Sequence, residues 1–344
     1  MLGWLFSKIG NFRNLLYERG VLHTSSLGVP VYSIGNISVG GTGKTPLVAY
    51  VASLLAERGE KVCILTRGYG RENPKERVVV SDGSTILADV KKAGDEPLEL
   101  AKKLLGKAVV VADGDRVSAG LRAKEEFGIT AFVLDDAFQN RRVERDLDIV
   151  CIDATNPFGS GSSLRAGLLR EPPRNLKRAG AIVVTRANLA GDLDNLLAKI
   201  YELAPESDVF SIENRTSGLT DPEGLPVPGI EDVKAKKAVA FCALGNPANF
   251  FDQLKMDGFE IAAARDFRDH HFYSEEDMAE LGALASENGA EVLLTTAKDA
   301  VKLSGLKIEL PCYVVESELI FDDENAFRES IYSFLSGGPF LSPQ

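Results

Sequence analysis

The chain has 344 residues, of which 44% are hydrophobic and 26% are charged, and its formal net charge is −11 at pH 7. This length gives room for two domains, and the composition excludes disordered and fibrous proteins. The excess of acidic residues argues against a nucleic-acid partner, because nonspecific binding to nucleic acid requires an excess of Lys and Arg.

The N-terminal segment has apolar residues at helical spacing over positions 2–16, with basic residues among them. We therefore predict an amphipathic helix over residues 1–20. One alternative is that this helix packs on its own domain, which the pattern alone favours. The other is that it lies in a membrane interface, with Trp4 and Phe6 on its apolar side.

From residue 29 onward, runs rich in Val and Ile alternate with segments of helical periodicity. Strands buried on both faces have this continuous apolar character, which predicts an α/β domain with a doubly wound, mostly parallel sheet. We expect this first domain to span residues 1–212. Its strands are predicted at 29–38, 62–66, 109–113, 131–136, 148–153 and 181–185, and its helices at 45–58, 97–104, 116–127 and 191–203.

The stretch 213–236 is rich in Pro, Gly and Asp, which predicts a β-type linker or a hairpin. The strand and helix alternation resumes over 237–318, which predicts a second, smaller α/β domain. The C-terminal segment 319–344 contains a last helix, near 324–335, that has either domain to pack on. Within the second domain, strands are predicted at 238–245, 259–267, 292–299 and 312–317, and helices at 247–256 and 275–287.

A phosphate-binding loop is predicted between the first strand and its helix. The segment matches G-x-x-x-x-G-K-[ST] at every position except the first, where Ser38 replaces Gly. Backbone N–H groups of such a loop and the dipole of the following helix favour phosphate oxygens. Lys44 is expected to reach the β- and γ-phosphates of ATP, and Thr45 to ligate Mg²⁺. The loop comprises Ser38, Val39, Gly40, Gly41, Thr42, Gly43, Lys44 and Thr45. The alternative is a glycine-rich turn without a ligand.

A second anchor for Mg²⁺ is expected at the end of a neighbouring strand, where Asp135 and Asp136 follow four apolar residues. The alternative for one of them is that it caps the next turn. The guanine-reading motif N-K-x-D is absent, because the segment 295–301 has a Lys-Asp pair without the Asn. These features predict an ATPase, a GTPase or a kinase.

The four cysteines lie far apart, within apolar runs, and none forms a C-x-x-C pair. We expect buried, reduced thiols of a cytosolic protein. No run approaches the roughly 18 apolar residues that span a bilayer. Lys8 interrupts the N-terminal apolar segment too early for a signal peptide. The protein is therefore expected in the cytoplasm, with access to a membrane surface.

Seven motifs in this chain, in this order, resemble those of the tetraacyldisaccharide 4′-kinase family of lipid A biosynthesis. They are GNISVGGTGKTP, RGYGR, GDEP, DDAFQNRR, LREP, DFRDHHFY and TTAKDAVKL. Two motifs depart from the family pattern: Ala137 and Asn140 stand where the family usually has Gly and His, and Arg165 and Leu168 stand where it usually has Pro. The resemblance covers nearly the whole chain.

The resemblance implies transfer of the ATP γ-phosphate to the 4′-hydroxyl of tetraacyldisaccharide 1-phosphate. It also implies a peripheral protein at the cytoplasmic face of the bacterial inner membrane, with the smaller domain closing over ATP. We expect a monomer. Two other functions stay open: a nucleotide-dependent switch or assembly protein, which needs no base, and a kinase of a soluble small molecule, which needs no membrane helix.

An unactivated hydroxyl acceptor benefits from a general base by roughly 10²–10⁴-fold. The residues alone favour Asp95, in GDEP, as a helix cap, whereas the resemblance assigns it as the base. The resemblance also assigns His270 as the partner that orients Asp95, with His271 as the alternative. Glu171, in LREP, is a catalytic candidate on the resemblance alone.

Further charged residues follow predicted strand ends. Arg116 is a candidate to stabilise phosphate charge, and Arg67, beside another strand end, is a candidate to bind the substrate, although solvated Arg is the commoner case. Lys298 and Asp299 are candidates to contact ATP from the second domain.

Basic and polar residues also follow the two predicted metal carboxylates. Gln139, Arg141 and Arg142 are candidates to bind the substrate. The basic cluster over 165–178 suits an anionic glycolipid or lipid headgroups, with a plain solvated face as the alternative.

Overall fold

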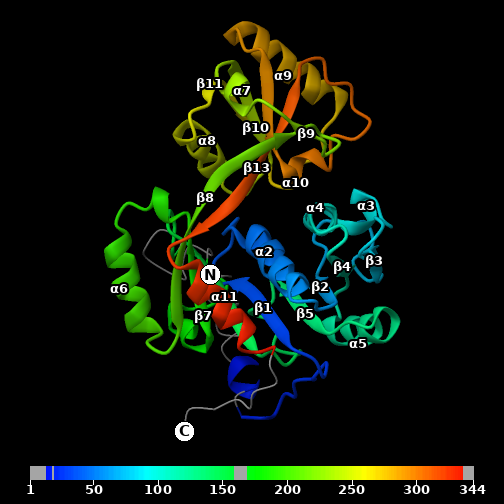
Figure 1. Cartoon of the computed structure of the whole chain (residues 1–344), viewed down its shortest axis with the longest axis vertical. Helices are drawn as coiled ribbons and strands as arrows, with labels where there is room; N and C mark the ends of the chain where they lie inside the picture. The colour runs from blue at the N-terminus through cyan, green and yellow to red at the C-terminus, as the bar shows by residue number, and fades with distance from the viewer. Residues whose placement is uncertain (1–12, 18, 159–168, 336–344) are drawn as a thin grey trace.

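The structure is a computed structural model that describes residues 13–17, 19–158 and 169–335. One sheet runs through the molecule in the order β11-β10-β12-β13-β8-β7-β6-β1-β5-β2-β4-β3, with β9 beside β8 (Figure 1). Most neighbouring strands pair in parallel, and the exceptions are β13 with β8, β3 with β4, and β8 with β9. The predicted α/β class with a mostly parallel sheet is confirmed.

The bounds of the elements agree closely with the predicted ranges in most cases. The strands are β1 (Val31–Asn36), β2 (Val62–Thr66), β3 (Val78–Ser81), β4 (Ala108–Ala112), β5 (Ala131–Asp135), β6 (Leu147–Asp153), β7 (Ala181–Thr185), β8 (Asp208–Thr220), β9 (Pro226–Val227), β10 (Lys237–Cys242), β11 (Glu260–Asp266), β12 (Val292–Thr296) and β13 (Cys312–Phe321). The helices are α2 (Lys44–Glu57), α3 (Val90–Ala93), α4 (Asp95–Lys103), α5 (Arg116–Phe127), α6 (Leu193–Leu203), α7 (Ile230–Lys234), α8 (Pro247–Met256), α9 (Glu275–Asn288), α10 (Ala297–Ala300) and α11 (Glu324–Tyr332), with 3-10 turns η1 (Pro173–Arg178) and η2 (Ala187–Leu189).

The larger lobe comprises β1 to β7 with helices α2 to α6 and α11. All six residues of β1 are buried, because helices cover both faces of the sheet around it. Apolar residues of α2 and α4 pack on one face, and those of α5 pack on the other. The phosphate-loop strand therefore lies in the middle of the core, where its carboxyl end is held rigidly.

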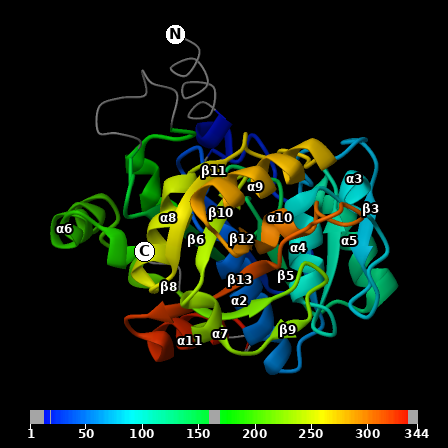
Figure 2. The ribbon, with the colours of Figure 1, turned by 90° about the horizontal axis from the view of Figure 1, so that it is seen from above.

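The smaller lobe comprises β9 to β12 with helices α7 to α10, and it lies at the top of Figure 1. Helix α9 packs on one face of its strands, and α7 and α8 pack on the other. Figure 2 views the molecule from this end, with the smaller lobe nearest the viewer. The predicted second α/β unit therefore has its own two-sided core.

Two long antiparallel strands, β8 and β13, connect the lobes. Residues 213–220, predicted as the start of a linker, form the second half of β8, and a short hairpin to β9 follows. The prediction missed the strand because its residues are polar and half-exposed. The pairing of β8 with β13 shifts register between Glu316 and Ser317.

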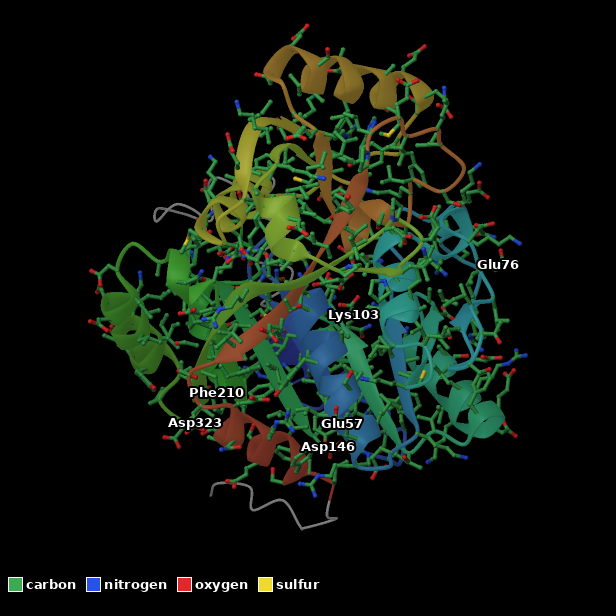
Figure 3. The ribbon with its side chains drawn as sticks, turned by 45° about the horizontal axis from the view of Figure 1, so that its top comes forward. Glu57, Glu76, Lys103, Asp146, Phe210 and Asp323 are labelled. Atoms are coloured by element: carbon green, nitrogen blue, oxygen red, sulfur yellow. The ribbon has the colours of Figure 1, made fainter. Side chains whose placement is uncertain are left out.

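The last helix, α11, packs on the larger lobe. Its N-cap is Asp323, whose side chain accepts a hydrogen bond from the Ala326 N–H. Phe327 lies edge-on to Phe210 of β8, with ring centroids 5.2 Å apart, and Figure 3 labels Phe210 and Asp323 beside this helix. The hydroxyl of Tyr32, in β1, donates to the carbonyl oxygen of Ile331 over 2.9 Å.

Some predicted ranges were wrong in detail. The strand expected over 292–299 ends at Thr296, because the Thr296 side chain accepts from the Asp299 N–H and starts α10 there. The strand expected over 238–245 ends at Cys242. Strand β3 and helix α3 were not predicted.

Several other expectations concern the ends of the chain and the thiols. All four cysteines are buried and free, as expected. Residues 13–17 are helical, whereas the rest of the predicted N-terminal helix up to residue 12, and Arg165 in the basic cluster, lie outside the described residues. In the part of the chain that the structure describes, no helix has both the length and the apolar character needed to cross a bilayer.

Candidate active site

A cavity of about 1890 Å³ lies between the two lobes. The phosphate loop, the ends of β2 and β5, and the start of α4 line it from the larger lobe, and loops of the smaller lobe close it from the other side. Lys103 of α4, labelled in Figure 3, also lines it. The predicted site residues that line the cavity are Val39, Gly40, Gly41, Thr42, Gly43, Lys44, Thr45, Arg67, Arg116, Asp135, Asp136, Gln139, Arg141, Arg142, Glu171, His270 and Lys298. Ser38 and Asp95 lie outside this lining.

The phosphate loop connects β1 to α2. Gly40 has φ 118° and Gly43 has φ 73°, and L-residues with side chains rarely adopt such values. A side chain at Gly43 would also press on Thr185 of β7, whose Cγ2 lies 3.3 Å from the Cβ position. Two side chains hold Thr42: Asn36 donates to its hydroxyl over 2.8 Å, and the Thr185 hydroxyl donates to its carbonyl over 3.1 Å. The loop is therefore fixed by its neighbours before any ligand arrives.

Ser38, at the first position of the loop motif, forms an isolated antiparallel bridge with Leu169. Ser38 is buried, with 5% of its surface exposed. The structure therefore places Ser38 at the base of the loop, in contact with the segment that leads to Arg170.

Asp135 is the last residue of β5, and Asp136 follows it and lies close to Lys44 of the loop. Lys44 Nζ lies 3.4 Å from Asp136 Oδ1, and Arg170 Nη1 lies 2.7 Å from both carboxylate oxygens of Asp136. Although burial opposes it, the charges of Lys44 and Arg170 hold the pKa of Asp136 below its ordinary value. Asp136 adopts a left-handed φ of 49°, which is uncommon for a residue with a side chain.

Asp135 differs from its neighbour in its electrostatic surroundings. It accepts one hydrogen bond, from the Thr66 hydroxyl over 2.8 Å. Burial, followed by the negative charges of Glu96 and Asp136, raises the pKa of Asp135 above its ordinary value. A carboxylate in this position favours a nearby cation, so Asp135 and Thr45, which both line the cavity, suit a magnesium ion. Among the described residues, no cluster of three or more His, Cys, Asp or Glu is arranged to hold a metal ion.

Asp95 and His270 come together across the two lobes, although they are 175 residues apart in the sequence. Asp95 is the first residue of α4 and is 5% exposed, and His270 lies in the loop between β11 and α9. His270 Nδ1 lies 2.8 Å from Asp95 Oδ2 and 3.0 Å from Oδ1. The helix-cap alternative for Asp95 does not match this geometry, because Gly94 is the N-cap of α4.

The pair shifts the pKa of both partners. The hydrogen bond to Asp95 raises the pKa of His270 above its ordinary value, although burial opposes the shift. Burial would raise the pKa of Asp95, but the hydrogen bond with His270 and the charges of Lys298 and Lys302 hold it below its ordinary value. At neutral pH the arrangement therefore contains an ionised Asp95 and a more basic His270.

His271 has a different partner. Its Nε2 lies 3.0 Å from Asp277 Oδ2, and its ring stacks on Phe267 with centroids 4.9 Å apart. The structure thus pairs Asp95 with His270 and packs His271 against its own lobe. His270 has a left-handed φ of 63°, and its ring contacts Tyr69 of the larger lobe with centroids 4.9 Å apart.

Lys298 extends from α10 toward the cavity wall. Its Nζ lies 3.1 Å from Asp269 Oδ1, 3.5 Å from Glu96 Oε1 and 3.9 Å from Asp95 Oδ2. Although burial opposes it, these three carboxylates raise the pKa of Lys298. The ammonium group is therefore firmly charged at the junction of the two lobes.

Two predicted arginines line the cavity, one of them buried and the other exposed. Arg116, the first residue of α5, is 5% exposed, and its Nη1 donates to the carbonyl of Asp113 over 3.2 Å. Its Nε is buried without a hydrogen-bond partner, and burial lowers its pKa. Arg67 is exposed on the same wall. This pair provides positive charge opposite Asp135.

The residues after Asp136 contact the N-terminal helical segment. Gln139 Nε2 donates to the Asn36 carbonyl over 2.8 Å, and Arg13 donates to the Gln139 carbonyl over 2.8 Å. Arg141 donates to the Asn14 carbonyl over 3.2 Å. Arg142 is exposed and lies 3.8 Å from an Asp115 carboxylate oxygen.

Glu171 is 2% exposed and is surrounded by hydrogen-bond donors. Its Oε2 accepts from Asn14, Asn175 and Arg178 over 3.0, 2.6 and 2.9 Å. These contacts join the N-terminal segment to the η1 turn, so they favour a brace at the cavity wall over a group that reacts.

Several residues of the site were missed in the sequence. Lys302 was missed; it forms a buried pair behind Asp95 with Asp299, which was expected to contact ATP but does not line the cavity. Arg186, which follows β7, donates to the Gly41 carbonyl over 3.0 Å and to Asp153 Oδ2 over 2.6 Å. The motif TTAKDAVKL contains both Asp299 and Lys302, so it carried the signal for the first pair. No local signal pointed to the second pair.

Comparison with known proteins gives consistent similarities over nearly the whole chain. A sequence model of the tetraacyldisaccharide-1-P 4′-kinase family matches residues 1–336. The tetraacyldisaccharide 4′-kinase of Geobacter sulfurreducens is 38% identical over 316 residues, which cover 92% of this chain and 86% of that protein. The protein of the same name from Desulfatibacillum aliphaticivorans is 35% identical and covers 98% of this chain and 92% of its own.

One solved structure is similar over the same extent. It is LpxK from Aquifex aeolicus in complex with ATP, which covers 97% of both chains with a TM-score of 0.77 and 34% sequence identity.

Proposed function

This chain belongs to the tetraacyldisaccharide 4′-kinase family, and on that premise we propose that it transfers the γ-phosphate of ATP to the 4′-hydroxyl of tetraacyldisaccharide 1-phosphate in lipid A biosynthesis. The enzyme is a phosphotransferase with an alcohol group as acceptor. One observation carries the mechanism: the phosphate loop and His270, which is paired with Asp95, line one cavity.

The phosphate end of the cavity binds ATP. Backbone N–H groups of the loop and the N-terminus of α2 cradle the phosphates, and Lys44 neutralises charge on the β- and γ-phosphates. Thr45 and Asp135 would hold Mg²⁺, which supplies charge neutralisation between the phosphates when bound. Asp136 keeps Lys44 directed at the phosphates, and Arg170 holds Asp136 in place.

The acceptor end activates the sugar hydroxyl. Asp95 was expected as the base with His270 orienting it, whereas the geometry favours the reverse order. Asp95 is buried and directs its oxygens at His270 Nδ1, so Nε2 is the ring nitrogen left to take a proton. The 4′-oxygen forms a bond to the γ-phosphorus while the bond from that phosphorus to the β–γ bridging oxygen breaks. The hydroxyl proton passes to His270 Nε2, and ADP leaves.

Positive charge around the bonds that form and break at the γ-phosphorus stabilises the transferred phosphate. Arg116 and Arg67 face the space above Asp135, and Lys298 reaches the cavity from the smaller lobe, where it can contact ATP. Gln139, Arg141 and Arg142 line the cavity beside the N-terminal segment and would contact the phosphate of the acceptor. Glu171 braces this side through its contacts with Asn14 and Arg178.

The two lobes would act as the predicted domains, with residues 237–318 closing over ATP; strands β8 and β13, and not residues 213–236 alone, connect them. Gly245 of the smaller lobe supports this arrangement, because its Cβ position lies 3.4 Å from the Gly41 nitrogen in the phosphate loop. Closure would therefore bring the smaller lobe directly onto the bound phosphates.

The enzyme would work as a peripheral monomer at the cytoplasmic face of the inner membrane. The N-terminal helix and the basic residues Arg174 and Lys177, both exposed, would face anionic headgroups.

A nucleotide-dependent switch is the second candidate. It would need no group to accept a proton, so the buried Asp95–His270 pair disfavours it. A kinase of a soluble small molecule would share the whole site and would differ in its acceptor alone.

The test is transfer of label from γ-labelled ATP to tetraacyldisaccharide 1-phosphate in detergent micelles with Mg²⁺. We expect label on the lipid with the wild-type protein and none with Lys44→Ala. Lys75→Ala, an exposed lysine of the same lobe, is the matched control and should label the lipid normally. Absence of labelled lipid despite ATP binding would support the switch.

A further inference from the structure

Lys302 is a buried lysine with no part in the reaction described above. Its side chain is 0% exposed, and its Nζ lies 2.9 Å from Asp299 Oδ1 and 3.7 Å from Asp95 Oδ2. It also lies over the ring of Tyr273, 5.5 Å from the centroid. An ammonium group without water is costly to bury unless its surroundings compensate for the lost hydration.

Asp299 is the fixed end of this arrangement. The residue is 0% exposed, and its Oδ2 accepts from the Ala243 N–H over 3.1 Å and from the Thr296 hydroxyl over 2.7 Å. These donors follow β10 and end β12, so they are anchored in the core of the smaller lobe. Lys302 therefore has a rigid carboxylate behind it and the Asp95 carboxylate in front of it.

The contact with Asp95 crosses the junction of the lobes. Lys302 approaches Oδ2, which is also the oxygen nearest to His270 Nδ1. Lys302 Nζ is buried without a hydrogen-bond partner of good geometry. A purely structural pair with Asp299 would not require the ammonium group to lie between two carboxylates of different lobes.

Lys298 and Lys302 both face Asp95, but their situations differ. Lys298 lines the cavity, has Asp269 as its closest carboxylate at 3.1 Å, and is the proposed contact for ATP. The Lys302 side chain is fully buried, so its ammonium group stays beside Asp95 and Asp299. When Lys298 engages a phosphate, Lys302 is the cation that stays beside Asp95. The acidic groups near the pair are Glu96 and Glu99 on α4, Asp269 beside His270, and Asp299.

We propose that Lys302 is a positioning residue for the Asp95–His270 pair: anchored by Asp299, its charge fixes the Asp95 carboxylate, ionised, against His270 Nδ1. This inference rests on the proposed function for its catalytic meaning. Its physical content, that a fixed charge controls the protonation of the pair, does not rest on that function. The depressed pKa of Asp95 agrees with it.

The test is the pKa of His270, measured by NMR titration of its ring in the folded, substrate-free protein. The chain has three histidines, so the ring signals can be assigned with His23→Ala and His271→Ala variants. Lys302→Met keeps the length of the side chain and removes its charge. Because Lys302 holds the Asp95 carboxylate against Nδ1, and that hydrogen bond raises the pKa of His270, we expect the loss of Lys302 to lower the pKa of His270 by roughly one pH unit.

Two controls separate charge from packing. Lys302→Arg keeps the charge and should leave the pKa of His270 near the wild-type value. Lys307→Met removes an exposed lysine of the same lobe, paired with Glu309 at 79% and 74% exposure, and should also leave it unchanged. If Lys302→Met does not fold, the double variant Asp299→Asn with Lys302→Met leaves no unpaired buried charge and should show the same downward shift.

If Lys302→Met or the double variant folds and the pKa of His270 in it is unchanged, the inference is overturned. The lipid assay gives the second reading: we expect the turnover of Lys302→Met to fall about tenfold at neutral pH, because the pair is no longer held in place, and its acid limb to move to lower pH. A wild-type protein that labels no lipid would count against the proposed function, whereas the NMR comparison would still decide the role of Lys302.

Discussion

The two ends of the cavity are built in different ways. The phosphate end is one uninterrupted piece of chain, residues 38–45, held by side chains of the larger lobe such as Asn36 and Thr185. The acceptor end joins Asp95 of the larger lobe to His270 of the smaller lobe, 175 residues away. The first end exists as soon as the larger lobe folds, and the second exists while the lobes are together.

This difference divides the expected effects of substitutions. Changes at the phosphate end should reduce ATP binding and turnover together. Changes at the acceptor end should reduce turnover and leave ATP binding largely intact, because no atom of the Asp95–His270 pair belongs to the phosphate loop. The following changes test that division in order of decreasing effect.

The largest effect separates the two adjacent histidines. His270→Ala should lower kcat by roughly 10²–10⁴-fold, because it removes the group that takes the hydroxyl proton. His271→Ala is the matched control, since His271 pairs with Asp277 instead, and it should keep kcat within a few-fold of wild type. Steady-state kinetics of both variants on the lipid substrate measure this. Equal losses in the two variants would contradict the assignment.

The pH dependence follows from the raised pKa of His270. The reaction needs a neutral Nε2, so the rate should rise with pH through that raised pKa, above the ordinary value of about 6.5. In Asp95→Asn the hydrogen-bonded charge is lost, so the remaining activity should have its acid limb at lower pH. Rate profiles between acid and neutral pH measure the shift, and a limb that stays in place would show that the pair does not set it.

The raised pKa of His270 also makes the free energy of unfolding depend on pH. Because folding raises the pKa of His270, the pair's contribution to the free energy of unfolding is fully present below the unfolded value of about 6.5. It is lost as pH rises through the folded value. Asp95→Asn should therefore destabilise the protein more at pH 6 than at pH 8.

Glu171 gives a smaller effect that lies outside both ends. Glu171→Gln should lower the free energy of unfolding by about 2 kcal/mol, because Arg178 loses a buried partner. As a brace, it should change kcat only several-fold. Chemical denaturation and lipid phosphorylation measured on one preparation test this. A loss of kcat as large as that of His270→Ala, with unchanged stability, would restore the catalytic role that the family resemblance implies.

The sequence predicted the local parts of this molecule well. The phosphate loop could be identified because its chemistry depends on consecutive residues between a strand and a helix. The paired Asp135 and Asp136 followed from one strand end. Helix α8 was predicted with both bounds correct, because Asn246-Pro247 is a strong start signal.

The remaining parts depend on contacts between distant segments. Without the family resemblance, nothing in GDEP distinguished a buried catalytic carboxylate from a helix cap, because the partner of Asp95 lies in the other lobe. Strand β8 could not be recognised in the sequence, because its second half, residues 213–220, is polar and half-exposed. Lys302 could not be placed behind Asp95 from its neighbours in sequence, since the contact depends on how the lobes meet.

The most direct test of the division between the two ends is the ATP affinity of Lys44→Ala and His270→Ala, measured by calorimetry with Mg²⁺ present. We predict that Lys44→Ala binds ATP at least tenfold more weakly, about 1.4 kcal/mol, and that His270→Ala binds it as wild type does while failing to phosphorylate the lipid. Equal weakening of ATP binding in both variants would contradict the account, because it would show that the two ends form one binding unit.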